Sequence, residues 1–438
     1  MSIINVKGTH DIIGKESELF HYVESLMRLI SKQYAFSEVR PPVLEHSELF
    51  VRGVGESSDV VRKEMYTFLD KGERSLTLRP EFTAGIMRLI VQNKLYATND
   101  LPLKYFYLGP VFRYERPQLG RYRQFNQFGV ECVGGNSYFY DVETISLAYD
   151  ILKSLKLNNV VIKINTLGDE ESRNNYRLAL KEFFKEHIID MCEDCKQRYE
   201  LNPLRILDCK VPEDQEIVKN APKMSDYLTN ESKERFQRVL SALEQLEIPY
   251  IVDDGLVRGL DYYSETVFEF HYTSQNGNNY GAIGAGGHYS HLVKEVGGPD
   301  IPGIGFSFGV ERIVSVLKDD NILNEEKIDD RVDFYVMPIG EENLNYAYEI
   351  ARKIRHLDFS VDICLEKAKV PAMFKRAEKK NVRFAIIIGE NEVKERKIII
   401  KNLASQQQIE LSEDKIFSDI YDIYDQCFSC DGDCENCR

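Results

Sequence analysis

The sequence lacks any apolar run long enough to cross a bilayer, and its first residues lack the apolar core of a signal peptide. It also lacks internal repeats and low-complexity segments. The apolar fraction of 43% is ordinary for a globular chain, and 438 residues predict two or three domains. We therefore expect a cytoplasmic protein that does not contact a membrane.

Basic residues are outnumbered, with 56 Lys and Arg against 71 Asp and Glu. The formal net charge is −15, which argues against a nucleic-acid partner, because such proteins usually carry a basic surface. The charge is uneven, however. Residues 331–411 hold 15 Lys and Arg against 12 Asp and Glu, about +3, whereas residues 412–438 hold 2 against 8, about −6. The basic segment is compatible with phosphate contacts, and equally with an ordinary mixed surface.

The nine cysteines are an odd number, which in a reducing compartment predicts thiols or metal ligands. The tail carries two Cys-x-x-Cys pairs whose four thiolates could hold Zn²⁺ or an iron–sulfur cluster. These are Cys427, Cys430, Cys434 and Cys437. Their spacer is shorter than in common zinc modules, and a reduced terminus without metal is the alternative. A weaker candidate with one ligand missing consists of Cys192, Cys195 and Cys209.

Periodicity predicts a mixed first part of the chain. Apolar residues at helical spacing indicate a helix over residues 16–34, and Pro41-Pro42 prevents a helix after it. We expect strands at residues 74–78, 104–114, 124–133, 160–165 and 267–272. The second and third of these form a long hairpin. Residues 170–245 are charged and mostly helical in pattern, which indicates an insertion into the first domain.

A different pattern follows the charged residues 318–330, which we interpret as a linker. Strands and helices alternate from residue 332 to residue 388, which is typical of an α/β domain. Two antiparallel strands, near residues 398–401 and 408–411, and a helix over residues 414–424 complete it.

Four arginines within eleven residues distinguish the loop of the hairpin: Arg113, Arg116, Arg121 and Arg123. The guanidinium group is planar and always charged, so it suits phosphate oxygens. Several arginines meeting at one polyphosphate would neutralise charge during nucleotidyl transfer. A solvated hairpin tip is the alternative explanation.

Two further segments could line a site. Residues 303–312 place glycines two and then four apart before a helix, which allows a flat ligand to approach the backbone, with Arg312 in the first helical turn. A tight strand–helix junction explains the glycines equally well, and the spacing does not match a dinucleotide fingerprint. Residues 256–263 place Arg258 close to two tyrosines, as in a substrate pocket or a packed surface cluster.

These segments together resemble the class II aminoacyl-tRNA synthetases. Arg40-Pro41-Pro42, the arginine hairpin and the glycine-to-arginine element look like motifs 1, 2 and 3 of that class. Residues 256–263 resemble the signature of the histidyl-tRNA synthetases, and residues 7–11, 77–81 and 121–125 are also similar. The resemblance extends to about Leu411.

The resemblance implies a fold. It consists of an α+β catalytic domain with an antiparallel sheet over residues 1–325, interrupted by the helical insertion at about 170–245. A C-terminal α/β anticodon-binding domain follows over residues 331–425. The cysteine-rich tail, residues 426–438, has no counterpart in the common family pattern. Dimerisation through motif 1, where Pro42 matches, is implied as well.

The resemblance also implies site residues. Five match the ATP-binding positions: Arg113, Glu115, Arg121, Arg123 and Arg312. Ten match the histidine-binding positions: Glu81, Phe82, Thr83, Arg113, Gln127, Glu131, Arg258, Tyr262, Tyr263 and Tyr289. Arg258 matches the catalytic arginine of the family and would act with Arg113. Arg116 and Gln118 fall in the loop expected to meet the tRNA acceptor end.

The activity implied is ligation of L-histidine to its tRNA through a histidyl-adenylate, with ATP as substrate and Mg²⁺ neutralising the pyrophosphate. The alternative is a non-catalytic paralogue that senses histidine and regulates ATP phosphoribosyltransferase. Such paralogues usually lack the C-terminal domain, which this chain keeps. The chain departs from the family at His288 and Ser290, where an arginine and an aspartate are usual, and at His291, where a glycine is usual. It also departs at Phe82, where a smaller residue is usual. We expect a rebuilt loop in which histidine and serine replace the ion pair.

Overall fold

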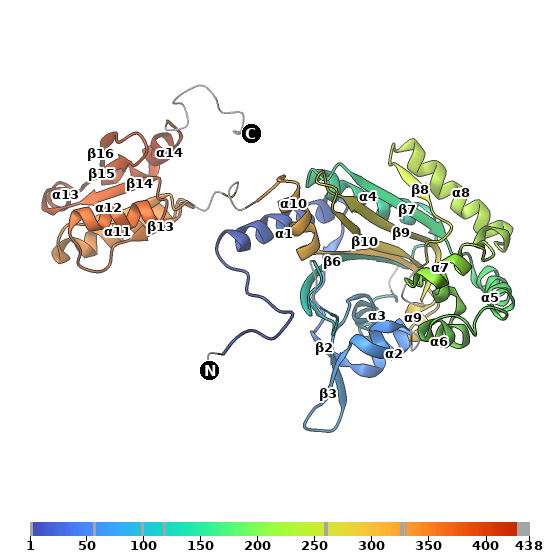
Figure 1. Ribbon diagram of the computed structural model, residues 1–438. Coiled ribbons are helices and arrows are strands. Elements are labelled where there is room, and N and C mark those ends of the chain that lie inside the picture. Colours follow the sequence, from blue (N-terminus) through green and yellow to red (C-terminus); the bar gives the residue numbers. More distant parts are fainter. Residues whose placement is uncertain are drawn as a thin grey trace. The chain divides into compact units, whose positions relative to one another are not determined.

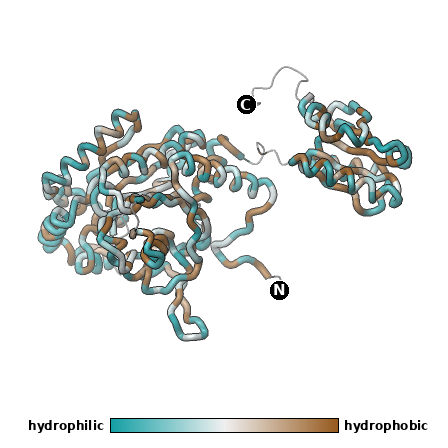
Figure 2. Tube along the Cα trace, turned by 180° about the vertical axis from the view of Figure 1, so that it is seen from behind, coloured by the Kyte–Doolittle hydropathy of each residue, from teal (hydrophilic) through white to brown (hydrophobic). Residues whose placement is uncertain are grey.

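The computed structural model describes residues 3–55, 58–97, 100–116, 120–257, 262–324, 328 and 331–426. The chain divides into two compact units, Met1–Ile328 and Asp329–Arg438 (Figure 1). The outer helices alternate between hydrophilic and hydrophobic residues along their length (Figure 2), as expected for helices that bury one face. Among the described residues, no helix has the length and apolarity needed to cross a bilayer.

The first unit is built around an eight-stranded sheet in the order β1-β5-β6-β11-β10-β9-β7-β8. Neighbouring strands are antiparallel except for the β1–β5 and β7–β8 pairs. A separate three-stranded sheet has the order β2-β4-β3. The strands are β1 (Ser37–Glu38), β2 (Leu44–His46), β3 (Tyr66–Leu69), β4 (Ser75–Leu78), β5 (Leu103–Phe112), β6 (Gln124–Val133), β7 (Val160–Thr166), β8 (Tyr250–Val252), β9 (Tyr263–Thr273), β10 (Asn279–Tyr289) and β11 (Gly303–Gly309).

Helices cover this sheet and form the insertion between β7 and β8. They are α1 (Lys15–Gln33), α2 (Ser47–Val54), α3 (Thr83–Gln92), α4 (Phe139–Ser154), α5 (Glu170–Phe184), α6 (Glu193–Leu201), α7 (Pro212–Val218), α8 (Asn230–Gln245), α9 (Leu292–Glu295) and α10 (Val310–Asp319), with short turns η1 (Val60–Glu64), η2 (Pro203–Asp208) and η3 (Met224–Asp226). Helix α10 extends to Asp319, so the predicted linker begins two residues too early.

One face of the large sheet packs into the hydrophobic core and the other lines a cavity, because side chains alternate between the faces along each strand. On β6, Phe128 and Val130 enter the main hydrophobic core, which packs beneath α1, α4 and α10 (Figure 1). Gln127 and Glu131 point to the opposite face and line a cavity. The same alternation on β11 sends Phe306 and its even-numbered neighbours mainly to the core, and the glycines to the cavity side.

The second unit is an α/β domain with the predicted alternation. Its strands β12 (Phe334–Pro338), β13 (Val361–Ile363), β14 (Phe384–Ile388), β15 (Lys397–Asn402) and β16 (Gln408–Ser412) form a sheet in the order β13-β12-β14-β15-β16. The last two strands are antiparallel, as expected. The helices are α11 (Leu344–Arg355), α12 (Val370–Lys379), α13 (Glu390–Glu395) and α14 (Ile416–Gln426), with the short turns η4 (Glu341–Asn343) and η5 (Glu413–Lys415). Helices α11 and α14 pack on one face of the sheet and α12 on the other.

Candidate functional site

A cavity of about 420 Å³ lies on the open face of the large sheet. Residues from β6, β10, β11, the arginine hairpin, the α3 N-terminus and the insertion meet there. The residues predicted from sequence that line it are Glu81, Thr83, Arg113, Glu115, Arg121, Gln127, Glu131, Tyr262, Tyr263, Tyr289 and Arg312. Side chains spread over more than two hundred positions of sequence therefore share one cavity.

Two buried carboxylates define one part of this cavity. Glu81, which is 3% exposed, precedes α3 and accepts hydrogen bonds from the backbone N–H groups of Thr83 at 2.5 Å and Ala84 at 2.9 Å. Glu131, which is 1% exposed, accepts hydrogen bonds from the hydroxyls of Thr83 at 2.6 Å and Tyr289 at 2.7 Å. Burial raises the pKa of Glu131 to about 8 and also raises the pKa of Glu81. A cationic ligand would restore the charged form of both.

Tyrosines and an amide complete that part of the site. The Tyr262 ring packs against Tyr263 at 4.5 Å and edge-on against Tyr289 at 5.8 Å, measured between ring centroids. Gln127 donates from Nε2 to the Ser307 hydroxyl at 3.0 Å, while its Oε1 has no hydrogen-bond partner among the described residues. A buried polar atom normally has a partner, so this oxygen is suited to a ligand N–H.

The backbone makes room for these groups at two glycines. A Cβ added to Gly305 would lie 2.1 Å from Glu131 Oε2, and one added to Gly129 would lie 2.3 Å from the Tyr107 hydroxyl. Any larger residue would therefore displace the groups that surround Glu131. The glycine pattern seen in the sequence serves close packing around a buried carboxylate, as well as lining the cavity.

Arginines form the other part of the cavity. Arg113 follows β5 directly and donates from Nε to the Pro80 carbonyl at 2.9 Å, which fixes its position. Arg312, in the first turn of α10, donates to the Ala282 carbonyl at 2.6 Å. Burial, followed by the positive charge of Arg121, lowers the pKa of Arg312. Glu115 lies 3.6 Å from Arg121. Convergent cations of this kind are stabilised by a polyanionic ligand.

Several predicted residues do not line the cavity. Phe82 is 2% exposed and stacks on Tyr107 at 4.4 Å, behind the wall formed by its neighbours Glu81 and Thr83. Arg123 lies over the Tyr114 ring at 4.0 Å, and Arg116 is exposed. Arg258, Gln118 and the four tail cysteines lie outside the described residues.

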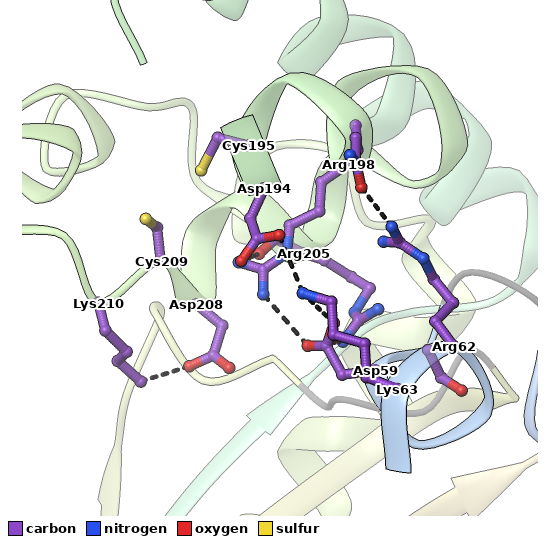
Figure 3. Close-up of polar contacts among 12 residues, drawn as sticks. Asp59, Arg62, Lys63, Asp194, Cys195, Arg198, Arg205, Asp208, Cys209 and Lys210 are labelled. Atoms are coloured by element: carbon purple, nitrogen blue, oxygen red, sulfur yellow. Dashed lines mark hydrogen bonds and ion pairs between the residues drawn. The ribbon is translucent and has the colours of Figure 1, made fainter. Parts of the chain in front are cut away.

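Other lining residues were not predicted from the sequence. Asp59, just before η1, Glu64, at its end, and Arg205 and Asp208 in η2 form a wall of the cavity. Arg205 and Arg198 both contact Asp59 Oδ2, at 3.0 and 3.3 Å (Figure 3). No motif marked these residues, because each looks like an ordinary charged residue of a surface helix.

The altered segment is the end of β10 and the start of α9. His288 is buried, and its Nδ1 lies 3.3 Å from the Ser264 hydroxyl, which in turn lies 2.8 Å from the Ser290 hydroxyl. His288 and Ser290 are therefore connected through Ser264, and not by the direct hydrogen bond expected from the sequence. His291 has a φ of −124°, so the backbone there has no need of glycine, as predicted.

Comparison with known proteins agrees with this geometry. The family model described as histidyl-tRNA synthetase matches residues 8–313, and the anticodon binding domain model matches residues 333–422. The chain belongs to the histidyl-tRNA synthetase family. The histidine–tRNA ligase of Bacillus subtilis is 44% identical over 93% of this chain and 96% of the relative. That of a Geobacillus species is 44% identical over 92% and 95%.

Solved structures of the histidyl-tRNA synthetase family have the same fold. The apo histidyl-tRNA synthetase of Staphylococcus aureus superimposes with a TM-score of 0.81 at 33% identity, covering 95% of this chain and 98% of that chain. The match extends over both units, so the C-terminal domain of the family is present together with the catalytic fold.

Proposed function

We propose that this chain ligates L-histidine to its tRNA in two steps and consumes ATP. The observation that carries the proposal is the single cavity in which two buried carboxylates, Glu81 and Glu131, face the same space as Arg113, Arg121 and Arg312. The carboxylates suit the ammonium and imidazole groups of histidine, and the arginines suit a triphosphate. The histidine carboxylate would then lie between the two groups and meet the α-phosphate.

In the first step the histidine carboxylate attacks the α-phosphate, the bond to pyrophosphate breaks, and histidyl-adenylate forms. Arg113 lines the cavity, is close enough to both Glu81 and Arg312 to affect their pKa values, and would stabilise the α-phosphate as its charge develops. Arg258 acts from the opposite side in the assignment taken from the family. Arg312 and Arg121 would hold the outer phosphates. In the second step the terminal ribose hydroxyl of the tRNA attacks the acyl carbon and AMP leaves.

Selection of histidine would depend on paired polar groups. Gln127 Oε1 and the Glu131 carboxylate are suited to ring N–H groups, and the tyrosines pack against the ring faces. A site built to hydrogen-bond its substrate rejects analogues that lack the polar atoms.

The residues present fit Mg²⁺. Glu64 lines the cavity beside Glu115, and burial together with the nearby Glu115 raises the pKa of Glu64. A carboxylate in that position favours a divalent cation shared with substrate phosphates. Mg²⁺ would supply neutralisation of the pyrophosphate. The tail cysteines remain a second proposed metal site, for Zn²⁺ or an iron–sulfur cluster.

The lining of a cavity on the second unit suits tRNA as a partner. This cavity of about 890 Å³ is lined by cationic and aromatic side chains. These are Arg331, Lys375, Arg383, Lys401, Phe374, Phe384 and Tyr424. Cations beside aromatic rings suit phosphates and unstacked bases, so we assign this surface to the anticodon. Arg116 and Gln118 are assigned to the acceptor end.

We further propose a homodimer that works in the cytoplasm, where protein synthesis uses charged tRNA. Exposed apolar side chains on the small sheet that follows motif 1 support the dimer: Leu44, Phe68 and Leu69. Sedimentation of the purified chain at micromolar concentration tests it, since a monomer would contradict the assignment.

The deciding experiment is aminoacylation of purified histidine tRNA with ATP and Mg²⁺, paired with pyrophosphate exchange that depends on histidine. Formation of histidyl-tRNA supports the proposal. Tight histidine binding without exchange or charging would overturn it in favour of the histidine-sensing paralogue.

A further inference from the structure

The insertion brings together four side chains with metal-binding groups. Cys192 and Cys195 lie at the start of α6, Cys209 follows η2, and Asp214 lies in α7. One ligand atom from each lies within 4.8 Å of the others. Cys195, Cys209 and Asp214 are buried, at 0%, 4% and 2% exposure. The sulfur atoms of Cys195 and Cys209 face a common space beside the charged cluster around Asp59 (Figure 3). We propose that these four residues bind one structural Zn²⁺ ion.

The distances suit a single tetrahedral ion. Ligands about 2.3 Å from Zn²⁺ place two sulfur atoms about 3.8 Å apart. Cys192 Sγ and Cys209 Sγ are 3.9 Å apart, and Cys209 Sγ lies 3.1 Å from Asp214 Oδ2. A disulfide would require a sulfur–sulfur distance of about 2.0 Å. The space enclosed by ligand atoms this close together has room for one ion, and none for several irons with bridging sulfides.

The backbone supports the thiolates as it does in zinc sites. Cys192 is the N-cap of α6, and its sulfur accepts a 3.5 Å hydrogen bond from the Cys195 N–H. The Val211 N–H donates in the same way to the Cys209 sulfur. The Cys192 N–H donates to both Asp214 oxygens, at 3.3 and 3.2 Å. Such hydrogen bonds hold ligands in place and stabilise their charged forms.

Asp214 is what distinguishes this cluster from ordinary buried thiols. Free cysteine is often buried as a small apolar residue, and three thiols alone would need no ion. A buried carboxylate among those thiols favours a bound ion, because burying a charge is costly unless the charge is paired or coordinates a metal. The Asp214 side chain accepts hydrogen bonds from the Cys192 N–H and the Cys209 thiol. Cys192 is half-buried, which leaves an entry path for the ion.

The part of the insertion around this cluster has a small core, of a kind that a bound ion can stabilise. Between α5 and α8 it contains short helical pieces of three to nine residues, packed around a small core that includes Cys195 and Cys209. Small cores of this kind are commonly stabilised by a metal. Turn η2, which ends immediately before Cys209, places Arg205 and Asp208 in the wall of the main cavity. The ion would thus fix one wall of the proposed ATP site without touching the substrate.

The test uses the full chain with the four tail cysteines changed to serine, so that any bound metal must come from elsewhere. We expect about one Zn²⁺ per chain by elemental analysis. X-ray absorption on this protein should show three sulfur neighbours near 2.3 Å and one oxygen near 2.0 Å. Cys209→Ser in that background should lower the zinc content about tenfold. The matched control is Cys364→Ser, a buried cysteine of the second unit, which should retain the full zinc content.

Each possible result either supports or overturns the zinc site. The proposal fails if the tail-serine protein, grown with zinc, carries less than about a tenth of an ion, if its zinc survives Cys209→Ser, or if absorption shows a different ligand set. If Cys209→Ser does not fold, Asp214→Asn is the second variant and should weaken zinc retention against a chelator. An intact Zn²⁺ site in a protein that does not charge tRNA would support this inference while contradicting the proposed function.

Discussion

The Tyr289 hydroxyl donates a 2.7 Å hydrogen bond to Glu131 Oε2, although 158 positions separate the two residues. The other carboxylate oxygen of Glu131 accepts from Thr83. Both donors can serve a charged or a neutral carboxyl group, but burial favours the neutral one and raises the pKa of Glu131 to about 8. The ligand-free protein therefore keeps this carboxyl protonated near neutral pH, and a cationic ligand would release the proton.

The first prediction follows for Glu131→Gln. Between pH 4.5, the ordinary value, and about 8, the folded protein binds a proton that the unfolded chain has released, so the free energy of unfolding falls as pH rises through that window. Glutamine does not titrate. From pH 6 to pH 8 the stability of the variant relative to the original chain should rise by about 2 kcal/mol. Urea unfolding at the two pH values measures it, and parallel pH curves would show that Glu131 is charged throughout.

The second prediction concerns Arg258, whose role is taken from the family resemblance. Arg258→Ala should lower kcat for histidyl-adenylate formation about 100-fold and leave the KM for ATP nearly unchanged, because the guanidinium acts on the transition state. Steady-state pyrophosphate exchange separates the two parameters. A variant that loses only affinity for ATP would refute the assignment.

The third prediction compares the ion pairs of two aspartates shown in Figure 3. Asp59 pairs with Arg205 and Arg198, whose side chains are 7% and 14% exposed, whereas Asp194 pairs with the exposed Lys63. Asp59→Asn should lower the free energy of unfolding by about 1–3 kcal/mol and raise the KM for ATP, since it loosens η2. Asp194→Asn, the matched control, should change stability by less than about 0.5 kcal/mol. Equal effects of the two substitutions on the KM for ATP would show that η2 does not contribute to ATP binding.

The fourth prediction tests the rebuilt segment. Burial and then the positive charge of Arg235 lower the pKa of His288 to about 3, so the site excludes a cation. His288→Arg should therefore cost about 3–5 kcal/mol of stability and reduce activity. Adding Ser290→Asp restores the acidic partner of the family and should recover most of both. Denaturation and aminoacylation report the outcome. If the single change raises activity sharply, the segment is damaged rather than rebuilt.

The fifth prediction addresses the second unit. Lys375→Glu combined with Lys401→Glu should raise the KM for tRNA about tenfold and leave pyrophosphate exchange unchanged, because both residues line the proposed anticodon surface. Arg352→Glu, on helix α11 across the sheet, is the control and should change neither quantity. An equal loss of pyrophosphate exchange would mean that the pair acts on folding and not on tRNA.

The sequence alone determined the elements whose patterns are local. Helix α1, the β5–β6 hairpin, the helical insertion and the alternation of the second unit all follow from periodicity. The arginines of the hairpin are recognisable because they lie close together in sequence. Strands β10 and β11 were missed, because glycine is rare in strands and these two are rich in it.

Only the tertiary structure decided which side chains meet. Glu131 gains Tyr289 and Thr83 through strand pairing and a helix end, Asp59 gains Arg205 from the insertion, and the three insertion cysteines come to lie beside Asp214. The physical reason is that burial and long-range strand register set these contacts and the resulting pKa shifts. Both depend on the packing of segments that no local pattern relates to each other.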